Sequence, residues 1–328
     1  MLNRLATLAL VVLAAGCGRR LDLPVEPEVP GTPTGQVAYV RQYLWENVPE
    51  LTDVVVTRGG TLFGIVDSTQ VNAYYSDNSV PRINTSRNIP HPVTIAGQPA
   101  QRPVQICEGA GSTLWVAYLL PVPMVAQFDV GGETATLITA GLVRDGTIVE
   151  FGGIAADPDS GFVYVADTFR STIGKYAPAA DGGRRVALLA TAGNGDGFVQ
   201  QPHGLYVFGD SLLVADTGKS WIQVLSADVP RAGRGQVAGP SEAPLDLRAP
   251  LDVWVDRNGF FYVADTGNSR VLKLGKRGDV REVVTELDPA APASPIALAA
   301  NPTQVWVPDP SRGLVFVYQI NTTIEELP

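Results

Sequence analysis

Short apolar segments separated by turn residues run along most of this chain, and one arrangement of them recurs. It is written "VYVADTFRSTIGKY" at 163–176, "LLVADTGKSWIQVL" at 212–225 and "FYVADTGNSRVLKL" at 261–274. Each stretch predicts two strands joined by a tight turn. The Asp of each stretch lies 49 residues from the next, and a period of that length indicates a propeller or another array of repeated sheets.

Following that step outward gives six units. Their marker residues, in chain order, are Asp67, Tyr118, Asp167, Asp216, Asp265 and Asp309. In each unit a first apolar segment is followed by a second one that ends at the marker, and then by a third. Most units also have a fourth segment. This order predicts a four-stranded antiparallel meander. One meander cannot bury both of its faces, whereas six packed around an axis can. The sequence therefore predicts an all-β fold, a six-bladed β-propeller with four antiparallel strands per blade.

Two segments could supply the outer strand of the sixth blade and so close the ring. The last unit could supply its own outer strand from residues 322–327, or residues 36–45 could return to complete the sixth blade. We slightly favour the second arrangement.

Residues 250–274, "PLDVWVDRNGFFYVADTGNSRVLKL", closely resemble the NHL repeat. Asp252 stands in the usual Gly place of that repeat and Ser269 in the usual His place. The third and fourth units resemble it well, the sixth loosely, and the first two only in pattern. The resemblance implies an NHL-type propeller from about residue 48 to the end of the chain.

The first 36 residues lack this pattern and indicate export. Residues 1–4 are a short basic start, and the apolar run at 5–15 is shorter than the roughly 20 residues of a membrane-spanning helix. It predicts a secretory signal. The run ends in "LAAGC" (13–17), which resembles the lipobox of bacterial lipoproteins and implies cleavage before Cys17 and acylation of that residue. The alternative is an ordinary signal peptide with an incidental cysteine.

We therefore expect a signal peptide at 1–16, an acylated Cys17 with a Pro-rich tether at 17–36, and the propeller at 37–328. Several acyl chains would give stable anchoring in the membrane of the bacterial cell envelope. Gly18 after the cysteine points to the outer membrane, on its periplasmic or outer surface. The Pro-rich tether would hold the folded part away from the lipid.

Charge and cysteine content narrow the classes of partner. The formal net charge of −9 disfavours nucleic acid and anionic lipid headgroups as ligands. With Cys17 acylated, Cys107 has no partner, so no disulfide is expected. The sequence also lacks a nucleophile elbow, a phosphate-binding loop and a CxxC pair.

The repeated aspartates have a structural and a functional interpretation. In the turn between the second and third strands, Asp167, Asp216 and Asp265 can accept hydrogen bonds from the backbone N–H groups that follow, while Gly supplies a positive φ. We predict that they cap these turns. The alternative is a ring of aspartates that coordinates a cation, and Tyr118 interrupts that ring.

The mouth of the axial channel is the predicted binding site. Threading the six units places Asp53, Gln105, Gly153, Gly204, Asp252 and Ala297 in equivalent positions there, with His203 just ahead of Gly204. Trp221 follows "TGKS" near the same face. The predicted binding residues are Asp53, Gln105, His203, Asp252 and Trp221.

The resemblance also implies two metal chemistries as alternatives. A zinc site of the propeller lyase type needs several converging histidines, typically three protein ligands, and the chain has only His91 and His203. A calcium or magnesium site of the gluconolactonase type would use Asp53, Glu108 and Asp252. We expect no cofactor, with a divalent cation such as calcium as the alternative.

The preferred hypothesis is a lipid-anchored, extracytoplasmic and monomeric propeller that binds an envelope protein or a glycan and catalyses no reaction. A metal-dependent hydrolase or lyase that uses the axial channel is the alternative. A third hypothesis is a structural spacer in an envelope assembly.

Overall fold

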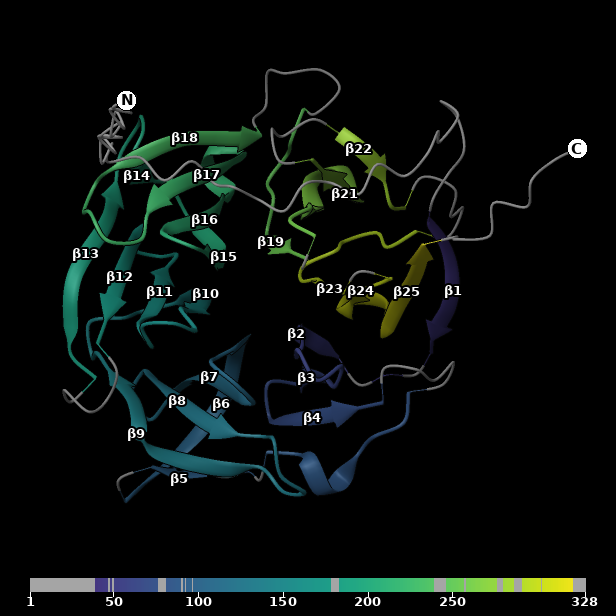
Figure 1. Cartoon of the computed structure of the whole chain (residues 1–328), viewed down its shortest axis with the longest axis horizontal. Helices are drawn as coiled ribbons and strands as arrows, with labels where there is room; N and C mark the ends of the chain where they lie inside the picture. The colour runs from purple at the N-terminus through teal and green to yellow at the C-terminus, as the bar shows by residue number, and fades with distance from the viewer. Residues whose placement is uncertain are drawn as a thin grey trace, which may run out of the picture.

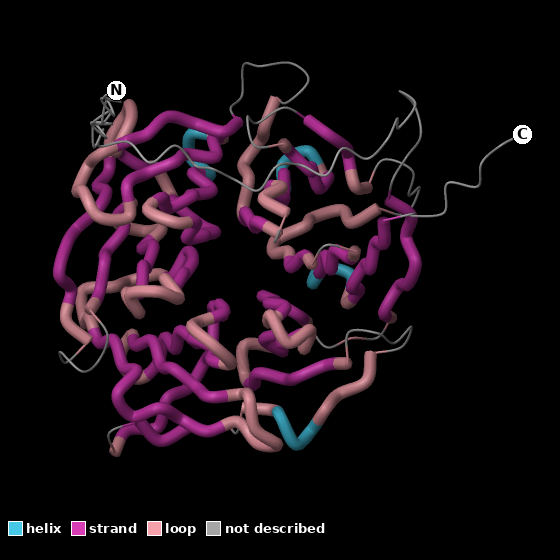
Figure 2. Tube along the Cα trace, viewed as in Figure 1, coloured by secondary structure: helices cyan, strands magenta, loops and turns pink. Residues whose placement is uncertain are grey.

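Six small sheets stand around a central axis in the computed structural model of this chain (Figure 1). The structure describes residues 39–320 except 47, 49, 76–80, 90, 92, 96, 178–182, 239–245, 257, 276–279, 286–290 and 302. The predicted signal peptide, Cys17 and the tether lie outside the described residues. Strands make up most of each blade, and the helical segments of the described residues are short (Figure 2). The predicted all-β, six-bladed propeller is confirmed.

The blades follow the order of the chain. The first contains β2 (Leu51–Val56), β3 (Leu62–Val66) and β4 (Gln70–Tyr74). The second contains β5 (Val93–Ile95), β6 (Gln98–Glu108), β7 (Thr113–Leu120), β8 (Met124–Asp129) and β9 (Thr136–Arg144). The third contains β10 (Phe151–Ala156), β11 (Val163–Asp167), β12 (Thr172–Tyr176), β13 (Arg185–Ala192) and β14 (Phe198–Val199).

The remaining three blades each have four strands. The fourth contains β15 (Pro202–Phe208), β16 (Ser211–Asp216), β17 (Trp221–Ser226) and β18 (Gly233–Ala238). The fifth contains β19 (Asp252–Val255), β20 (Phe261–Asp265), β21 (Arg270–Leu274) and β22 (Val280–Val283). The sixth contains β23 (Ala299–Ala300), β24 (Gln304–Asp309), β25 (Leu314–Ile320) and β1 (Tyr39–Trp45).

Helical structure among the described residues includes the one-turn 3₁₀ segments η1 (Thr85–Arg87), η3 (Thr217–Lys219), η4 (Thr266–Asn268) and η5 (Pro310–Arg312). None of the helices in this described part is long and apolar enough to cross a membrane. The last three of these segments follow the marker aspartates of the fourth, fifth and sixth blades, so they belong to the repeated turn.

The prediction of four strands in every blade is wrong for the first three blades. The described part of the first blade has three strands, and the second and third blades have five. In the second blade, β6 begins early and forms a hairpin with β5. In the third blade, the short strand β14 pairs in parallel with β13.

The strands β3, β7, β11, β16, β20 and β24 each have a neighbouring strand on either side, and most of their residues are buried. All residues of β3, β11, β16 and β20 are buried. Such strands are covered on both faces by neighbouring blades, which explains their continuous apolar sequence. The outer strand β13 is much less covered, with two buried positions among its eight residues. Continuous apolar sequence therefore marks the buried strands of a blade, and mixed apolar and polar sequence marks its outer strand.

The strand β1 closes the ring, as favoured from the sequence. It pairs antiparallel with β25, from Tyr39 opposite Ile320 to Trp45 opposite Val315. Trp45 is fully buried and its ring centroid lies 5.7 Å from that of Tyr74 in the first blade. The last and first blades are thus joined by main-chain pairing and by an aromatic contact. The rival strand at 322–327 lies outside the described residues.

The repeated Asp ties its turn to the loop that leads into the same blade. Four carboxylates each accept a hydrogen bond, of 2.7 to 2.9 Å, from a backbone N–H of that leading loop: Asp167 from Val149, Asp216 from Gln200, Asp265 from Arg248 and Asp309 from Ala293. The Thr that follows the Asp instead reaches the next blade. Its Oγ1 donates to a proline carbonyl in three blades: Thr168 to Pro202, Thr217 to Pro250 and Thr266 to Pro295.

The predicted capping geometry of these turns requires correction. Asp167 does accept a hydrogen bond from Arg170 N at 3.1 Å, but among the described contacts Asp216 and Asp265 accept none from the N–H groups of η3 and η4. The positive φ belongs to Ser220 and Ser269, at 57° and 53°. The carboxylates of Asp167, Asp216 and Asp265 are buried structural groups that bind the leading loop.

The glycines of these turns serve close approach of two backbones. A Cβ on Gly218 would lie 2.7 Å from the carbonyl oxygen of Gln200, and one on Gly267 would lie 2.6 Å from that of Arg248. The N–H groups of the two glycines donate to these same oxygens at 2.8 Å. At these two positions a side chain would collide with the backbone of the leading loop.

Strand register shifts the marker of the first unit by one residue. Val66 pairs with Leu51 as Asp167 pairs with Phe151, and both strands have a bulge directly after that pair. Asp67, which the repeat spacing aligned with Asp167, is exposed in the hairpin turn with φ of 50°. The first blade therefore lacks the buried carboxylate of the later blades.

Candidate functional site

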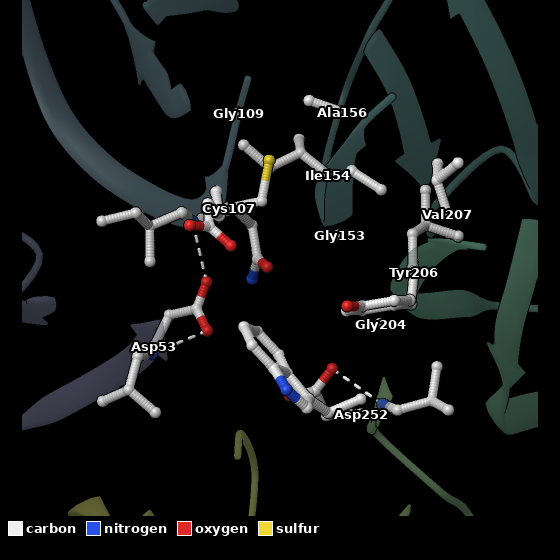
Figure 3. Close-up of a pocket in the computed structure, with 18 of the residues that line it drawn as sticks. Asp53, Cys107, Gly109, Gly153, Ile154, Ala156, Gly204, Tyr206, Val207 and Asp252 are labelled. Atoms are coloured by element: carbon white, nitrogen blue, oxygen red, sulfur yellow. Dashed lines mark hydrogen bonds between the residues drawn. The ribbon is translucent and has the colours of Figure 1, made fainter. Parts of the chain in front are cut away.

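A narrow cavity of about 90 Å³ follows the propeller axis and is lined by residues of all six blades. We call the face where the inner strands begin the mouth face. Asp53, Gln105 and Asp252 line the cavity at this end, as threading of the repeats predicted. Figure 3 shows Asp53 and Asp252 on different sides of the cavity, with hydrogen bonds drawn from each carboxylate.

The two axial aspartates make the same pair of contacts. Asp53 accepts hydrogen bonds from its neighbour Val54 N at 2.9 Å and from Ile106 N of the second blade at 2.8 Å. Asp252 accepts from Val253 N and from Leu298 N of the sixth blade, both at 2.8 Å. Each carboxylate therefore clamps its own inner strand to the inner strand of the next blade.

Glycine replaces this clamp in the third and fourth blades. Gly204 N donates to the carbonyl oxygen of Leu251 at 2.9 Å, and a Cβ on Gly204 would lie 2.7 Å from the Cα of Asp252. A Cβ on Gly153 would lie 2.6 Å from the carbonyl oxygen of His203. Adjacent inner strands therefore either touch through bare backbone or are bridged by a carboxylate.

Burial makes both axial carboxylates weak acids. Desolvation raises the pKa of Asp252 from 3.8 to about 7, against the lowering effect of its two N–H donors. Desolvation also raises the pKa of Asp53 well above its ordinary value, and the charge of Asp252 raises it further. The two groups therefore sense one another across the axis. Carboxylates that share a site in this way resist being charged together.

The other predicted mouth residues lie outside the cavity lining. His203 occupies the bulge of β15, and its Nδ1 lies 3.0 Å from the carbonyl oxygen of Gln201 and 2.9 Å from Thr217 Oγ1. Burial lowers the pKa of His203. Trp221 is half-buried at the start of β17, with Lys219 Nζ 5.0 Å from its ring centroid. The structure does not bring these two residues together with Asp53, Gln105 and Asp252 around one cavity.

The candidate metal residues are likewise spread along the axis. Glu108 ends β6, and its Oε1 accepts a hydrogen bond of 2.5 Å from Arg58 N at the far end of the channel. The described residues contain no group of three or more His, Cys, Asp or Glu side chains that could hold a metal ion. Cys107 is a free cysteine, and burial raises the pKa of its thiol well above the ordinary value. A thiol of that kind is a poor nucleophile.

Sequence reasoning missed two aromatic residues of the channel. Tyr206 and Trp254 stand two residues after the predicted mouth residues Gly204 and Asp252, and their rings meet edge to face with centroids 5.4 Å apart. Alternate residues of a strand share one face, so the period of two from Asp252 was the available signal.

A second, wider cavity of about 300 Å³ opens at the other end of the channel. It shares Tyr206 and Trp254 with the narrow cavity, so this aromatic pair lies where the two meet. We call it the exit vestibule. Thr57, Arg58, Glu108, Asp157, Asp159, Phe208, Asp256 and Asn301 are among its other lining residues.

An apolar patch lies on the mouth face over the second and third blades. Leu120 and Val122 at the turn after β7, Val149 in the loop before β10, and Phe169 in the turn after β11 are all exposed, Phe169 by 72 %. Thr168 N donates to the carbonyl oxygen of Glu150 at 3.0 Å, which joins two of these segments. Ile148, next to Val149, belongs to a core cluster, and Leu119, next to Leu120, packs against the same cluster. We call these four exposed residues the mouth patch.

Comparison with known proteins agrees with the fold. Residues 247–274 match the NHL repeat, and no curated protein matches the chain in sequence. A chain of the nidogen–laminin complex is similar with a TM-score of 0.54 at 16% identity, over 74% of this chain and 82% of that one.

Two further solved structures are similar. A protein of unknown function from Bacteroides thetaiotaomicron has a TM-score of 0.59 at 14% identity, over 85% of this chain and 70% of that one. The WD40 β-propeller domain of Doa1 has a TM-score of 0.56 at 10% identity, over 87% and 97%. At these identities the likeness concerns the fold alone. This chain is an all-β, six-bladed β-propeller that contains an NHL repeat.

Proposed function

We propose that this propeller is a non-catalytic binding module that holds a protein partner on its mouth face. The observation that carries the proposal is the mouth patch, formed by Leu120, Val122, Val149 and Phe169. Large apolar side chains that are exposed together on one face of a protein mark interaction sites. The axial carboxylates support it too, because they are occupied by backbone N–H groups of neighbouring blades.

The partner proposed for the mouth patch is a protein segment with apolar side chains. Two copies of one chain need about 800 Å² of buried surface per partner for a stable dimer, which is more than four side chains supply. Glu150 and Arg170, which follow Val149 and Phe169 in the chain, are both exposed and opposite in sign. They favour a partner with a few charges around an apolar centre. The similar chain in the nidogen–laminin complex belongs to a protein assembly, which supports this class.

Photocrosslinking in the organism that encodes the protein tests this proposal. A photoreactive amino acid at Val122 or Phe169 should crosslink to one protein, and the Phe169→Ser variant should lose co-purification of that protein. Val229, which is exposed by 56 % on the turn after β17, provides the control position. Equal crosslinking from Val229, or unchanged co-purification with Phe169→Ser, would contradict the proposal.

The same proposal places the propeller in the bacterial cell envelope, held by acyl chains on Cys17 and most simply in the outer membrane. Its support is the sequence "LAAGC" after a short apolar run. Metabolic labelling with an alkyne analogue of palmitate should tag the wild-type protein and not the Cys17→Ser variant. A Cys17→Ser variant that keeps the label and the membrane association would rule out this anchor.

A further inference from the structure

The exit vestibule lies at the end of the channel opposite the mouth patch, and it is the larger of the two axial cavities described. Its volume is about 300 Å³, and residues from each of the six blades line it. Figure 1 shows the six inner strands surrounding this axis. That volume is at the lower end of the range for small-molecule sites, which is about 300–1,000 Å³.

One wall of the vestibule is aromatic. Tyr206 and Phe208 come from the fourth blade and Trp254 from the fifth, and all three side chains are half-buried. The rings of Tyr206 and Trp254 contact each other at 61° between planes. Part of each aromatic surface therefore remains uncovered inside a concave site, where it can pack against an apolar face of a ligand.

The opposite wall, from the first three blades, is charged. Arg58 and Asp159 are exposed and Glu108 is half-buried. The Asp157 carboxylate accepts a hydrogen bond from Asp159 N at 3.0 Å, which fixes the turn that carries Asp159. Polar groups held in place by the turns of a rigid scaffold can donate to and accept from hydroxyl groups.

These two walls define the chemistry of the ligand. A purely apolar ligand would strip water from the charged wall without replacing its hydrogen bonds. A bare cation lacks a ligand set, since no metal-binding group of three side chains occurs in the described residues. A sugar ring has an apolar face of C–H groups and an edge of hydroxyl groups, which matches one aromatic and one polar wall.

We propose that the exit vestibule binds a neutral mono- or disaccharide, stacked on Trp254 and hydrogen-bonded to Arg58, Glu108 and Asp159. This site goes beyond the protein-binding face proposed above, because it lies at the other end of the axis. The ligand size follows from the cavity volume, which accommodates one or two sugar rings.

Saturation-transfer NMR and calorimetry on the folded propeller test the proposal with a defined panel. The probes are glucose, galactose, mannose, N-acetylglucosamine, lactose, maltose and cellobiose. At least one should receive saturation and bind with a dissociation constant at or below about 1 mM. Putrescine serves as a cationic probe, and binding of putrescine in place of every sugar would overturn the assigned class.

Matched variants locate the binding. Asp159→Ala and Trp254→Phe should each weaken sugar binding by about tenfold, because the first removes a hydrogen-bond acceptor and the second replaces the indole with a smaller stacking surface. Trp221→Phe and Phe169→Ser, which lie outside the vestibule, should leave the affinity unchanged. Thermal unfolding of each variant establishes that it is folded. No binding of any sugar at about 20 mM would overturn the proposal, and so would wild-type affinity in both Asp159→Ala and Trp254→Phe.

The two proposals fail independently. Phe169→Ser should abolish capture of the protein partner and preserve sugar binding, whereas Asp159→Ala should do the reverse. Loss of both by either single variant would contradict the separation of the two faces.

Discussion

Blades three, four and five carry the Ala-Asp-Thr turn, whereas blades one and two do not. In the later blades, buried carboxylates and threonine hydroxyls join each turn to its own leading loop and to the next blade. In the first two blades, Val66 and Tyr118 occupy the position of the carboxylate. There one large core cluster, which includes Phe63, Tyr118 and Phe128, spans both blades.

The difference shows that a propeller can join its blades by two kinds of contact. A hydrogen bond depends on one particular side chain, so that residue recurs at the same position in each blade and is recognisable as a motif. Apolar packing spreads over many side chains, so it tolerates sequence change and leaves only a pattern. The later blades should therefore depend strongly on single polar groups, and the first two blades should not.

The largest predicted effect is on a repeated carboxylate. Asp265 accepts hydrogen bonds from Arg248 N and Asn268 Nδ2 and forms an ion pair of 2.7 Å with Arg270. Asp265→Asn should lower the free energy of unfolding by about 3 kcal/mol, because the Arg270 charge loses its partner next to a fully buried site. Chemical denaturation measures the change.

Asp67→Asn is the matched control for that variant. Asp67 has the same place in the repeat spacing but is exposed in a turn, so its substitution should change the free energy of unfolding by less than about 0.5 kcal/mol. Equal losses at Asp67 and Asp265 would remove the distinction between the two groups of blades.

A smaller effect is predicted for the threonine that reaches the next blade. Thr266→Val removes the hydroxyl that donates to the Pro295 carbonyl at 2.6 Å, which should cost about 1 kcal/mol of unfolding free energy. Thr69→Val, at an exposed turn of the first blade where Thr69 Oγ1 donates only to Val66 O, should cost less than half as much. Urea denaturation of the two variants distinguishes them, and equal costs would contradict the prediction.

Sequence reasoning captured the parts of this fold that are local to one repeat. The 49-residue step located the blades, because each blade is folded by residues close together in the chain. It misassigned the donors to Asp216 and Asp265, because those donors, Gln200 and Arg248, come 16 and 17 residues earlier and meet the carboxylates only once the blade is formed.

The candidate site was predicted less completely than the fold. Asp53, Gln105 and Asp252 were placed on the axis by repeat equivalence alone. Whether the carboxylates were free for a ligand depended on Ile106 N and Leu298 N, which come from the next blade. Trp254 could have been placed on the cavity from its spacing of two residues after Asp252, whereas no local pattern encodes the exposure of Phe169.

The smallest predicted effect concerns pH and one axial clamp. The pKa of Asp252 is raised from 3.8 to about 7 by burial, so between about pH 4 and 7 the folded state holds a proton that the unfolded chain releases. Stability from this group is therefore present at low pH and lost as the pH rises through 7. The Tm of wild type should fall relative to that of Asp252→Asn by about 3 °C between pH 5 and 8. Parallel pH profiles would contradict this assignment.

The account depends most on the role of the axial carboxylates as clamps between blades. Amide NMR of Ile106 and Leu298 during a calcium titration to about 10 mM, above the range of weak extracellular calcium sites, tests that role directly. The clamp predicts that both amide signals stay at their positions throughout the titration. Saturable, calcium-dependent shifts of both signals would show that Asp53 and Asp252 bind metal, and would contradict their assignment as clamps between blades.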